Sequence, residues 1–169
     1  MLAAAAALLK AFWGVCTLRL APQDIPRSSA LLFSAGATNL AISTSINNIQ
    51  LALSSAFSVA VLEMTVLAGL TAALLFSFGR FPRFTQTLTA LLGSGAVIGL
   101  VVLAHLLALP QIPQILRITI FVWNLLVMAH ILRHALEFHI VASFFLAVGY
   151  AFILIQVIWF FDRLLNATA

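Results

Sequence analysis

Five long apolar runs, separated by short polar breaks, dominate the pattern of this chain. Most of them approach or exceed the roughly 20 residues that an α-helix needs to cross the hydrocarbon core of a bilayer. The breaks hold proline, glycine or charged residues, which end helices. The pattern predicts an all-α, polytopic transmembrane helical bundle with spans at about 30–46, 51–78, 86–109, 114–132 and 140–161.

The second run, 51–78, carries one carboxylate, Glu63, near its middle. An ionised carboxylate in hydrocarbon is costly, so this group must be protonated, paired or solvated. Ala52, Ala56 and Ala60 recur every four residues on the side of Glu63, and small residues let another helix come close. We therefore expect Glu63 to point into the bundle.

The first run is weak because hydroxyl and amide side chains interrupt it. Such a span needs helical neighbours that satisfy its polar groups. If this span were lost, the chain would cross the membrane four times, and if the N-terminal segment were inserted it would cross six times. The interrupting residues are Ser34, Thr38, Asn39, Ser43, Thr44 and Ser45.

Residues 2–18 have the composition of a helix but are short for a span, with Lys10 at the centre. A charge at the centre of a span costs about 2.5–3.5 kcal/mol on insertion scales. We therefore expect an amphipathic helix lying in the membrane interface, with Lys10 reaching towards water. Trp13 and Arg19 suit the same level of the membrane.

The segment 19–29 is the most polar stretch, and its two prolines forbid a continuous helix. Ser28 or Ser29 can cap the helix that follows. We expect a cytoplasmic loop of defined shape and the best candidate for contact with a partner. Its polar side chains are Arg19, Gln23, Asp24 and Arg27.

Composition supports a membrane protein. Of the 169 residues, 64% are hydrophobic and 7% are charged, and the mean hydropathy is +1.19. Soluble domains are about half apolar and about a quarter charged. One single membrane domain, 1–169, without a separate soluble domain is therefore predicted.

The basic residues indicate an orientation. The formal charge is +4, but the basic residues are scattered singly, which does not favour nucleic acid as a partner. With the N-terminus in the cytoplasm, six basic residues fall on that side and two, Arg117 and Arg163, on the other. The bias predicts a cytoplasmic N-terminus and, with five spans, a C-terminus on the opposite side.

Three further polar residues share the expected depth of Glu63: Ser94, Asn124 and Tyr150. Together they would form an intramembrane polar layer. One interpretation is a proton or ion relay, or a binding site for the headgroup of a substrate. The other is a protonated Glu63 that hydrogen-bonds between helices or meets a partner subunit.

His130, His134 and Glu137 follow one another at i, i+4 and i+7, on one face of a helix. Two imidazoles one turn apart can share a metal ion. The alternative is a polar stripe at the cytoplasmic end of a span. Apart from this possible metal, we expect no cofactor.

Gly95 and Gly99 form a GxxxG pattern, which predicts close helix packing within the chain or between copies. Trp13, Trp123 and Trp159 are expected to pack or to anchor. No P-loop, dinucleotide fingerprint, haem-attachment motif or serine elbow occurs in the sequence. We therefore expect a protein that is not an enzyme.

The layout resembles the Yip1-type family of small membrane proteins: an amphipathic N-terminal helix at 9–19, a proline-bearing loop, then about five spans. The loop Pro22-Gln23-Asp24-Ile25-Pro26 is also similar to the opening of uncharacterised proteobacterial inner-membrane proteins. The resemblance implies a multi-pass protein of the bacterial inner (cytoplasmic) membrane that acts through partners. It carries over no catalytic residue.

The leading hypothesis from the sequence is a non-enzymatic accessory or scaffold subunit. Its partners would be membrane lipids and other integral membrane subunits, or further copies of itself. The rival hypothesis is a small transporter or ion-coupled carrier that uses the polar layer around Glu63. A metal-binding membrane protein that uses His130 and His134 is a third possibility.

Overall fold

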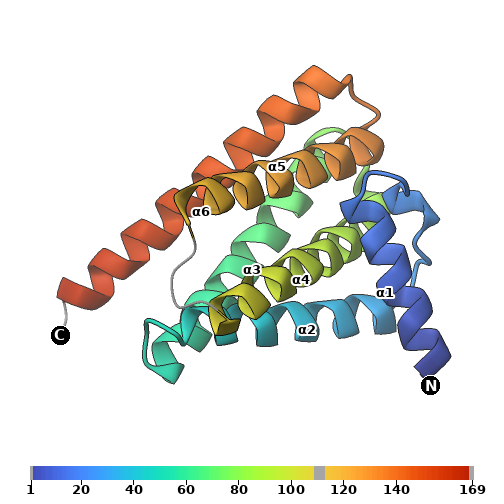
Figure 1. Cartoon of the computed structure of the whole chain (residues 1–169). Helices are drawn as coiled ribbons and strands as arrows, with labels where there is room; N and C mark the ends of the chain where they lie inside the picture. The colour runs from blue at the N-terminus through green and yellow to red at the C-terminus, as the bar shows by residue number, and fades with distance from the viewer. Residues whose placement is uncertain (1, 109–112, 168–169) are drawn as a thin grey trace.

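The computed structural model describes residues 2–108 and 113–167, with side chains described for 9–108, 113–161 and 163. Across these residues the chain forms helices and no strands (Figure 1). Five helices, α2 to α6, are long and apolar enough to cross a membrane, which confirms the predicted helical bundle of five spans. The helices are α1 (Leu2–Cys16), α2 (Ser29–Asn47), α3 (Leu53–Ser77), α4 (Phe84–Ala108), α5 (Gln114–Leu136) and α6 (Ile140–Ala167), with 3-10 turns η1 (Pro22–Asp24) and η2 (Phe81–Arg83).

The helix ends follow local chemistry. Ser28 is the N-cap of α2, and its hydroxyl oxygen accepts a hydrogen bond from the Leu31 amide at 3.3 Å. Helix α5 extends four residues beyond the expected end at Leu132. It ends at Glu137, whose φ of 61° is left-handed and breaks the helical run.

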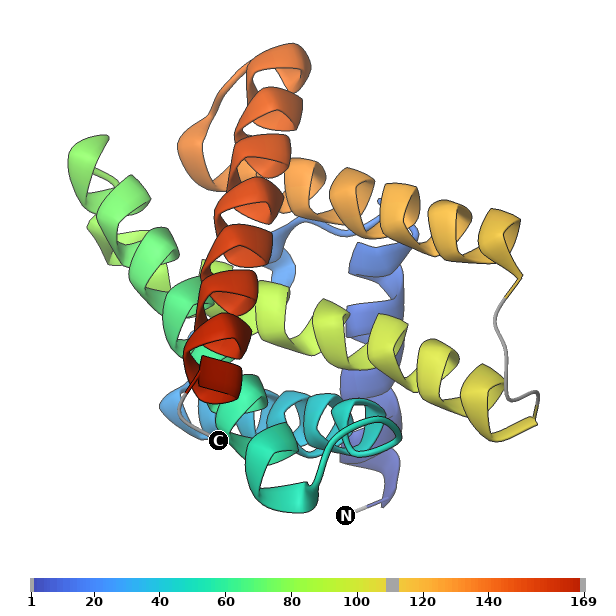
Figure 2. The ribbon, with the colours of Figure 1, turned by 90° about the vertical axis from the view of Figure 1, so that its left-hand side faces the viewer.

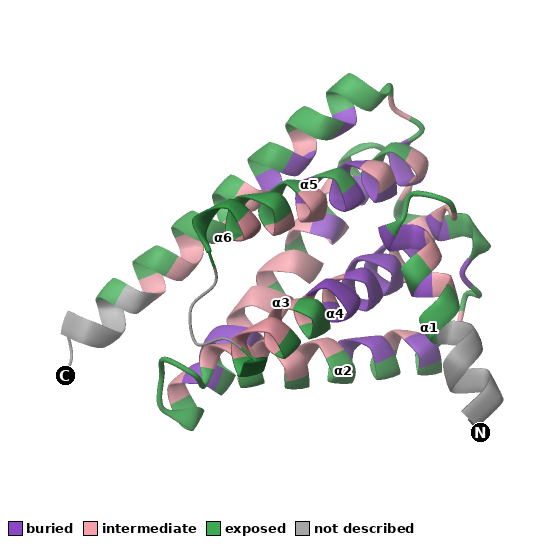
Figure 3. Cartoon of the chain, in the orientation of Figure 1, coloured by how far each residue is buried: buried purple, intermediate pink, exposed green. Residues whose placement is uncertain are grey.

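Helix α4 lies at the centre of the bundle, where it contacts α1, α2, α3 and α5. Its buried residues form an almost continuous block from Gln86 to Ile98 (Figure 3). The polar members of this block are paired within the chain. For example, Thr87 and Thr89 donate their hydroxyl hydrogens to the carbonyls of Arg83 and Thr85.

The outer surface of the bundle is apolar. Phe33, Phe76, Leu107 and Ile115 are each more than three quarters exposed. Exposed apolar area on this scale is unfavourable in water but costs nothing in contact with lipid tails. The surface thus agrees with a multi-pass integral membrane protein.

The two glycines of the GxxxG pattern lie where α4 meets α2. A methyl group at position 95 would lie 2.8 Å from the amide nitrogen of Asn39, and one at position 99 would lie 2.9 Å from Cγ2 of Ile42. Side chains at these two positions would therefore displace the side chains of Asn39 and Ile42. The pattern serves packing inside the chain.

Helix α1 runs across α4 instead of alongside it, as both views of the ribbon show (Figures 1 and 2). Phe12 lies against Gly93 of α4, where a methyl group would be 2.1 Å from the Phe12 ring. Val15 and Cys16 are fully buried, while Lys10 is exposed. The predicted location of α1 in the membrane interface stays a prediction.

The segment after α1 is docked along α5. The Trp123 indole donates to the Cys16 carbonyl at 2.9 Å, the His130 ring meets the Leu20 carbonyl at 3.0 Å, and the Gln23 amide donates to the His134 carbonyl at 2.9 Å. These three bonds follow α5 over eleven residues, or about 16 Å of helix axis. Non-helical backbone at membrane depth requires such partners inside the protein.

A second connection joins the turn between α3 and α4 to the end of α5. Arg80 and Arg83 both pair with Glu137, each at 2.5 Å. Arg83 also donates to the carbonyls of His134 and Ala135 in the last turn of α5. A guanidinium group at this end of a helix also complements the helix dipole.

Candidate functional site

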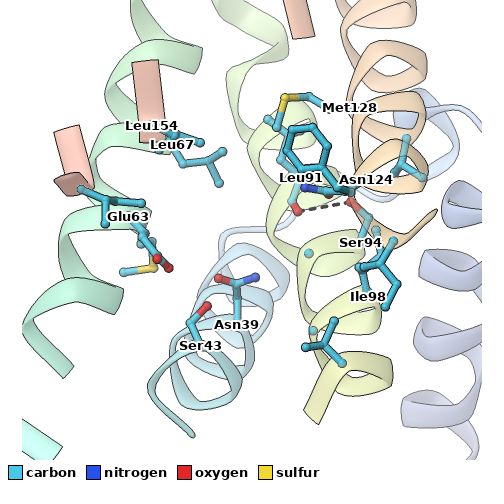
Figure 4. A pocket seen from close by; sticks show the side chains of 18 of the residues that line it. Asn39, Ser43, Glu63, Leu67, Leu91, Ser94, Ile98, Asn124, Met128 and Leu154 are labelled. Atoms are coloured by element: carbon cyan, nitrogen blue, oxygen red, sulfur yellow. Dashed lines mark hydrogen bonds between the residues drawn. The ribbon is translucent and has the colours of Figure 1, made fainter. Parts of the chain in front are cut away.

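A cavity of about 430 Å³ lies between the five spanning helices, and we call it the central cavity. Each of the five contributes to its wall, and Figure 4 shows it from close by. Most of the lining is apolar, with a few polar groups, as in small-molecule sites of about 300–1,000 Å³. The polar and charged lining residues are Asn39, Ser43, Glu63, Ser94, Arg117 and Asn124.

One wall of the central cavity is acidic and polar. Asn39 and Ser43 lie one turn apart on α2, and Glu63 extends towards them from α3 (Figure 4). The Asn39 amide nitrogen donates to the Leu92 carbonyl at 3.1 Å, which leaves the side-chain oxygen of Asn39 as an acceptor. Because Gly95 has no side chain, the Asn39 amide can lie against α4 at this position.

Glu63 forms no ion pair with any side chain that the structure describes. The Asn47 amide, one turn beyond Ser43 on α2, approaches the Glu63 carboxyl group without reaching hydrogen-bond geometry. A carboxylate held this way inside an apolar bundle is costly. The site therefore favours a bound proton or a bound cation at Glu63.

The opposite wall carries Ser94 of α4 and Asn124 of α5 (Figure 4). The Ser94 hydroxyl donates to the Leu91 carbonyl at 3.2 Å, within its own helix. Asn124 lies half-buried beside it with an amide that can both donate and accept. Three of the four residues expected in the polar layer thus line one cavity.

Tyr150, the fourth residue, lies elsewhere. Its hydroxyl is 2.5 Å from the Thr71 hydroxyl and 2.5 Å from the Leu67 carbonyl, so it joins α6 to α3. It lines a separate hollow on the side of α3 and α6. Equal depth in two spans does not decide which residues meet: Tyr150 bonds to Leu67 and Thr71, four and eight residues beyond Glu63 on α3.

Arg117 lines the central cavity near the start of α5, seven residues or about 10 Å of helix axis before Asn124. It is exposed and takes part in an interaction of its own. Phe121, one turn further along α5, also lines the cavity and is 46% exposed. Both residues thus line the cavity and are exposed on the outer surface of the bundle.

No protein-family model, no curated protein and no solved structure matches this chain. The resemblance to the Yip1-type family accordingly stays a prediction.

His130, His134 and Glu137, the three residues of the predicted metal site, all make contacts within the chain. His130 and His134 pack edge to face with ring centroids 4.6 Å apart, and His130 is also bonded to the Leu20 carbonyl. Glu137 lies beyond the helix and pairs with two arginines. Among the described residues no group of three histidine, cysteine, aspartate or glutamate side chains is arranged to hold a metal ion.

The other singled-out residues contribute mainly to packing and docking. Ala56 and Ala60 are buried in α3, whereas Ala52 precedes the helix and is exposed. In the loop, Asp24 caps η1 by accepting from the Ala21 amide at 2.8 Å, and Arg27 donates to Gln86 at 2.9 Å. Arg19 is exposed, and Gln23 is bonded to α5.

Asn39, Ser43 and Arg117 are the site residues that sequence reasoning missed. The sequence pattern predicts for the first two only that they weaken the first span, and for Arg117 only a charge on the far side of the membrane. Asn39, Ser43 and Asn47 recur every four residues, which places three polar side chains on one helical face. That spacing was the available signal.

Proposed function

We propose that this integral membrane protein is a small carrier that binds a polar solute in the central cavity. The observation that supports it is the position of Glu63, a carboxylate without an ion pair among the described residues, on a cavity walled by all five spans. Intramembrane ionisable groups that face such a cavity mark substrate or ion pathways. A scaffold subunit does not require an ionisable carboxyl group that faces a cavity within the membrane.

The carrier hypothesis requires water to reach the central cavity. Cys16 is the sole cysteine, so Cys16→Ala gives a background without thiols. In that background, Ser43→Cys and Asn124→Cys place single thiols on the two walls, and Phe152→Cys, a 60% exposed residue of α6, serves as the lipid-facing control. The measurement is the rate of labelling in vesicles by a hydrophilic, uncharged methanethiosulfonate.

We expect both cavity thiols to react much faster than the thiol at position 152, because the thiolate that reacts forms only in contact with water. Equal, slow labelling at all three positions would show a dry cavity and overturn the proposal. Reagent applied separately to the inside and the outside of the vesicles identifies the side on which the cavity opens. The predicted cytoplasmic N-terminus places Arg117 on the far side of the bacterial inner membrane.

A second candidate function is an accessory subunit that acts through partner membrane proteins. It is supported by the docked segment after α1, which holds Arg19, Gln23 and Asp24 exposed on a defined backbone. Such a preorganised polar surface lowers the entropic cost of binding. Photo-crosslinkers placed at these positions in native membranes would then capture a specific partner, and an isolated monomer without crosslinks would contradict this function.

A further inference from the structure

We infer that the central cavity is a binding site for small organic amines, with the protonated amine at Glu63 and the apolar part of the ligand against α4 and α5. This inference rests on the proposed carrier function and adds the chemical class of the ligand. It depends on the charge of one wall, the composition of the other wall and the size of the space.

The wall around Glu63 offers acceptors to an ammonium group. The Glu63 carboxylate supplies the charge, and the oxygens of Asn39 and Ser43 lie on the same side of the cavity (Figure 4). An ammonium group has three donors and no acceptor, so a carboxylate with two neutral oxygens suits it. Hydrogen bonds between charged groups are also stronger than neutral ones.

The rest of the lining favours an organic body over a bare metal ion. Met64, Leu91 and Met128 present apolar surface, and Phe121 presents an aromatic ring that can also attract a cation. A bare ion needs oxygens that converge on it from all sides; a calcium ion, for example, takes about six to eight oxygens at about 2.3–2.6 Å. The lining of the cavity, which has a volume of about 430 Å³, is mostly apolar, and its oxygens are divided between two walls (Figure 4), which does not favour a bare ion.

The test uses the full chain with Cys16→Ala and Asn124→Cys, and three probes with the same ring: benzylamine, benzyl alcohol and benzoate. Benzylamine is protonated at pH 7, benzyl alcohol is neutral and benzoate is anionic. Each is titrated for its ability to slow labelling of the thiol at position 124. We expect benzylamine to protect at a concentration at least about tenfold lower than either analogue, because only the amine forms charged hydrogen bonds with Glu63.

Glu63→Gln should bring benzylamine to the level of benzyl alcohol. Glu137→Gln is the matched control, since it removes the same charge at the surface of the protein and should leave protection unchanged. Equal protection by amine and alcohol in the parent chain would overturn the inference, even if Glu63→Gln failed to fold. Protection by sodium or potassium chloride but not by benzylamine would also overturn it.

The two proposals fail in different ways. If the thiol at position 124 reacts rapidly and benzylamine has no selective effect, the cavity is hydrated and only the ligand class is wrong. If the thiol reacts no faster than the one at position 152, the carrier function itself is wrong.

Discussion

The indole nitrogen of Trp123, near the middle of α5, donates a hydrogen bond of 2.9 Å to the carbonyl of Cys16, the last residue of α1. The last carbonyls of a helix lack partners within the helix. Here a side chain from a spanning helix supplies one. The bond explains how α1 ends against the bundle without an unsatisfied polar group.

Trp123→Phe should loosen α1 because it removes the donor and leaves the Cys16 carbonyl without this partner. An unsatisfied buried acceptor costs about 1–3 kcal/mol. We expect the free energy of unfolding in detergent to fall by about that amount. Trp159→Phe changes an exposed tryptophan of α6 and is the control, for which little effect is expected.

Cys16 should resist alkylation in the folded protein. Burial raises the pKa of its thiol from 9.0 to about 11, which lowers the thiolate fraction at pH 8 by about a hundredfold. Labelling by iodoacetamide should therefore require unfolding, and it should accelerate in Trp123→Phe. Rapid labelling of the native parent protein would contradict the burial of this end of α1.

Gly93→Ala should destabilise the contact between α1 and α4, because the added methyl group would lie 2.1 Å from the Phe12 ring. Overpacking of this kind costs about 1–3 kcal/mol. Phe12→Ala should remove most of the added cost of Gly93→Ala, which a double-mutant cycle of unfolding free energies measures. Gly149→Ala is the matched control, since nothing lies within 4 Å of the added methyl group.

Glu137 should make the stability of the folded protein depend on pH under acidic conditions. Its hydrogen bond with Arg83, assisted by Arg80, lowers the pKa of the Glu137 carboxyl group below its ordinary value. The stabilisation is complete above about pH 4.5 and is lost as the pH falls through the lowered pKa of the folded state. Thermal unfolding of the parent protein, measured from about pH 3 to about pH 7, should show this decline, because a carboxyl group titrates within that interval.

In Glu137→Gln the same thermal measurements should show a smaller decline on acidification, because glutamine does not titrate. If both proteins respond to pH in the same way, the ion pairs with Arg80 and Arg83 do not contribute to stability. The comparison needs no knowledge of function.

The sequence by itself determined the class of the protein and the approximate bounds of its spans. Length and apolar composition suffice for that, because a bilayer requires a helix of a certain length and excludes most polar groups. It also identified Glu63 as the residue in the least favourable surroundings. The expected position of Glu63 inside the bundle followed from Ala56 and Ala60, which the structure buries.

Only the tertiary structure decided which polar residues meet. Lipid and protein interior are both apolar, so the hydrophobic pattern does not specify which face of a membrane helix contacts which neighbour. Rotation and crossing of the helices place Asn39 and Ser43 beside Glu63, and direct Tyr150 to Thr71. For the same reason, the sequence pattern did not predict that the Trp123 indole donates a hydrogen bond to the last carbonyl of α1.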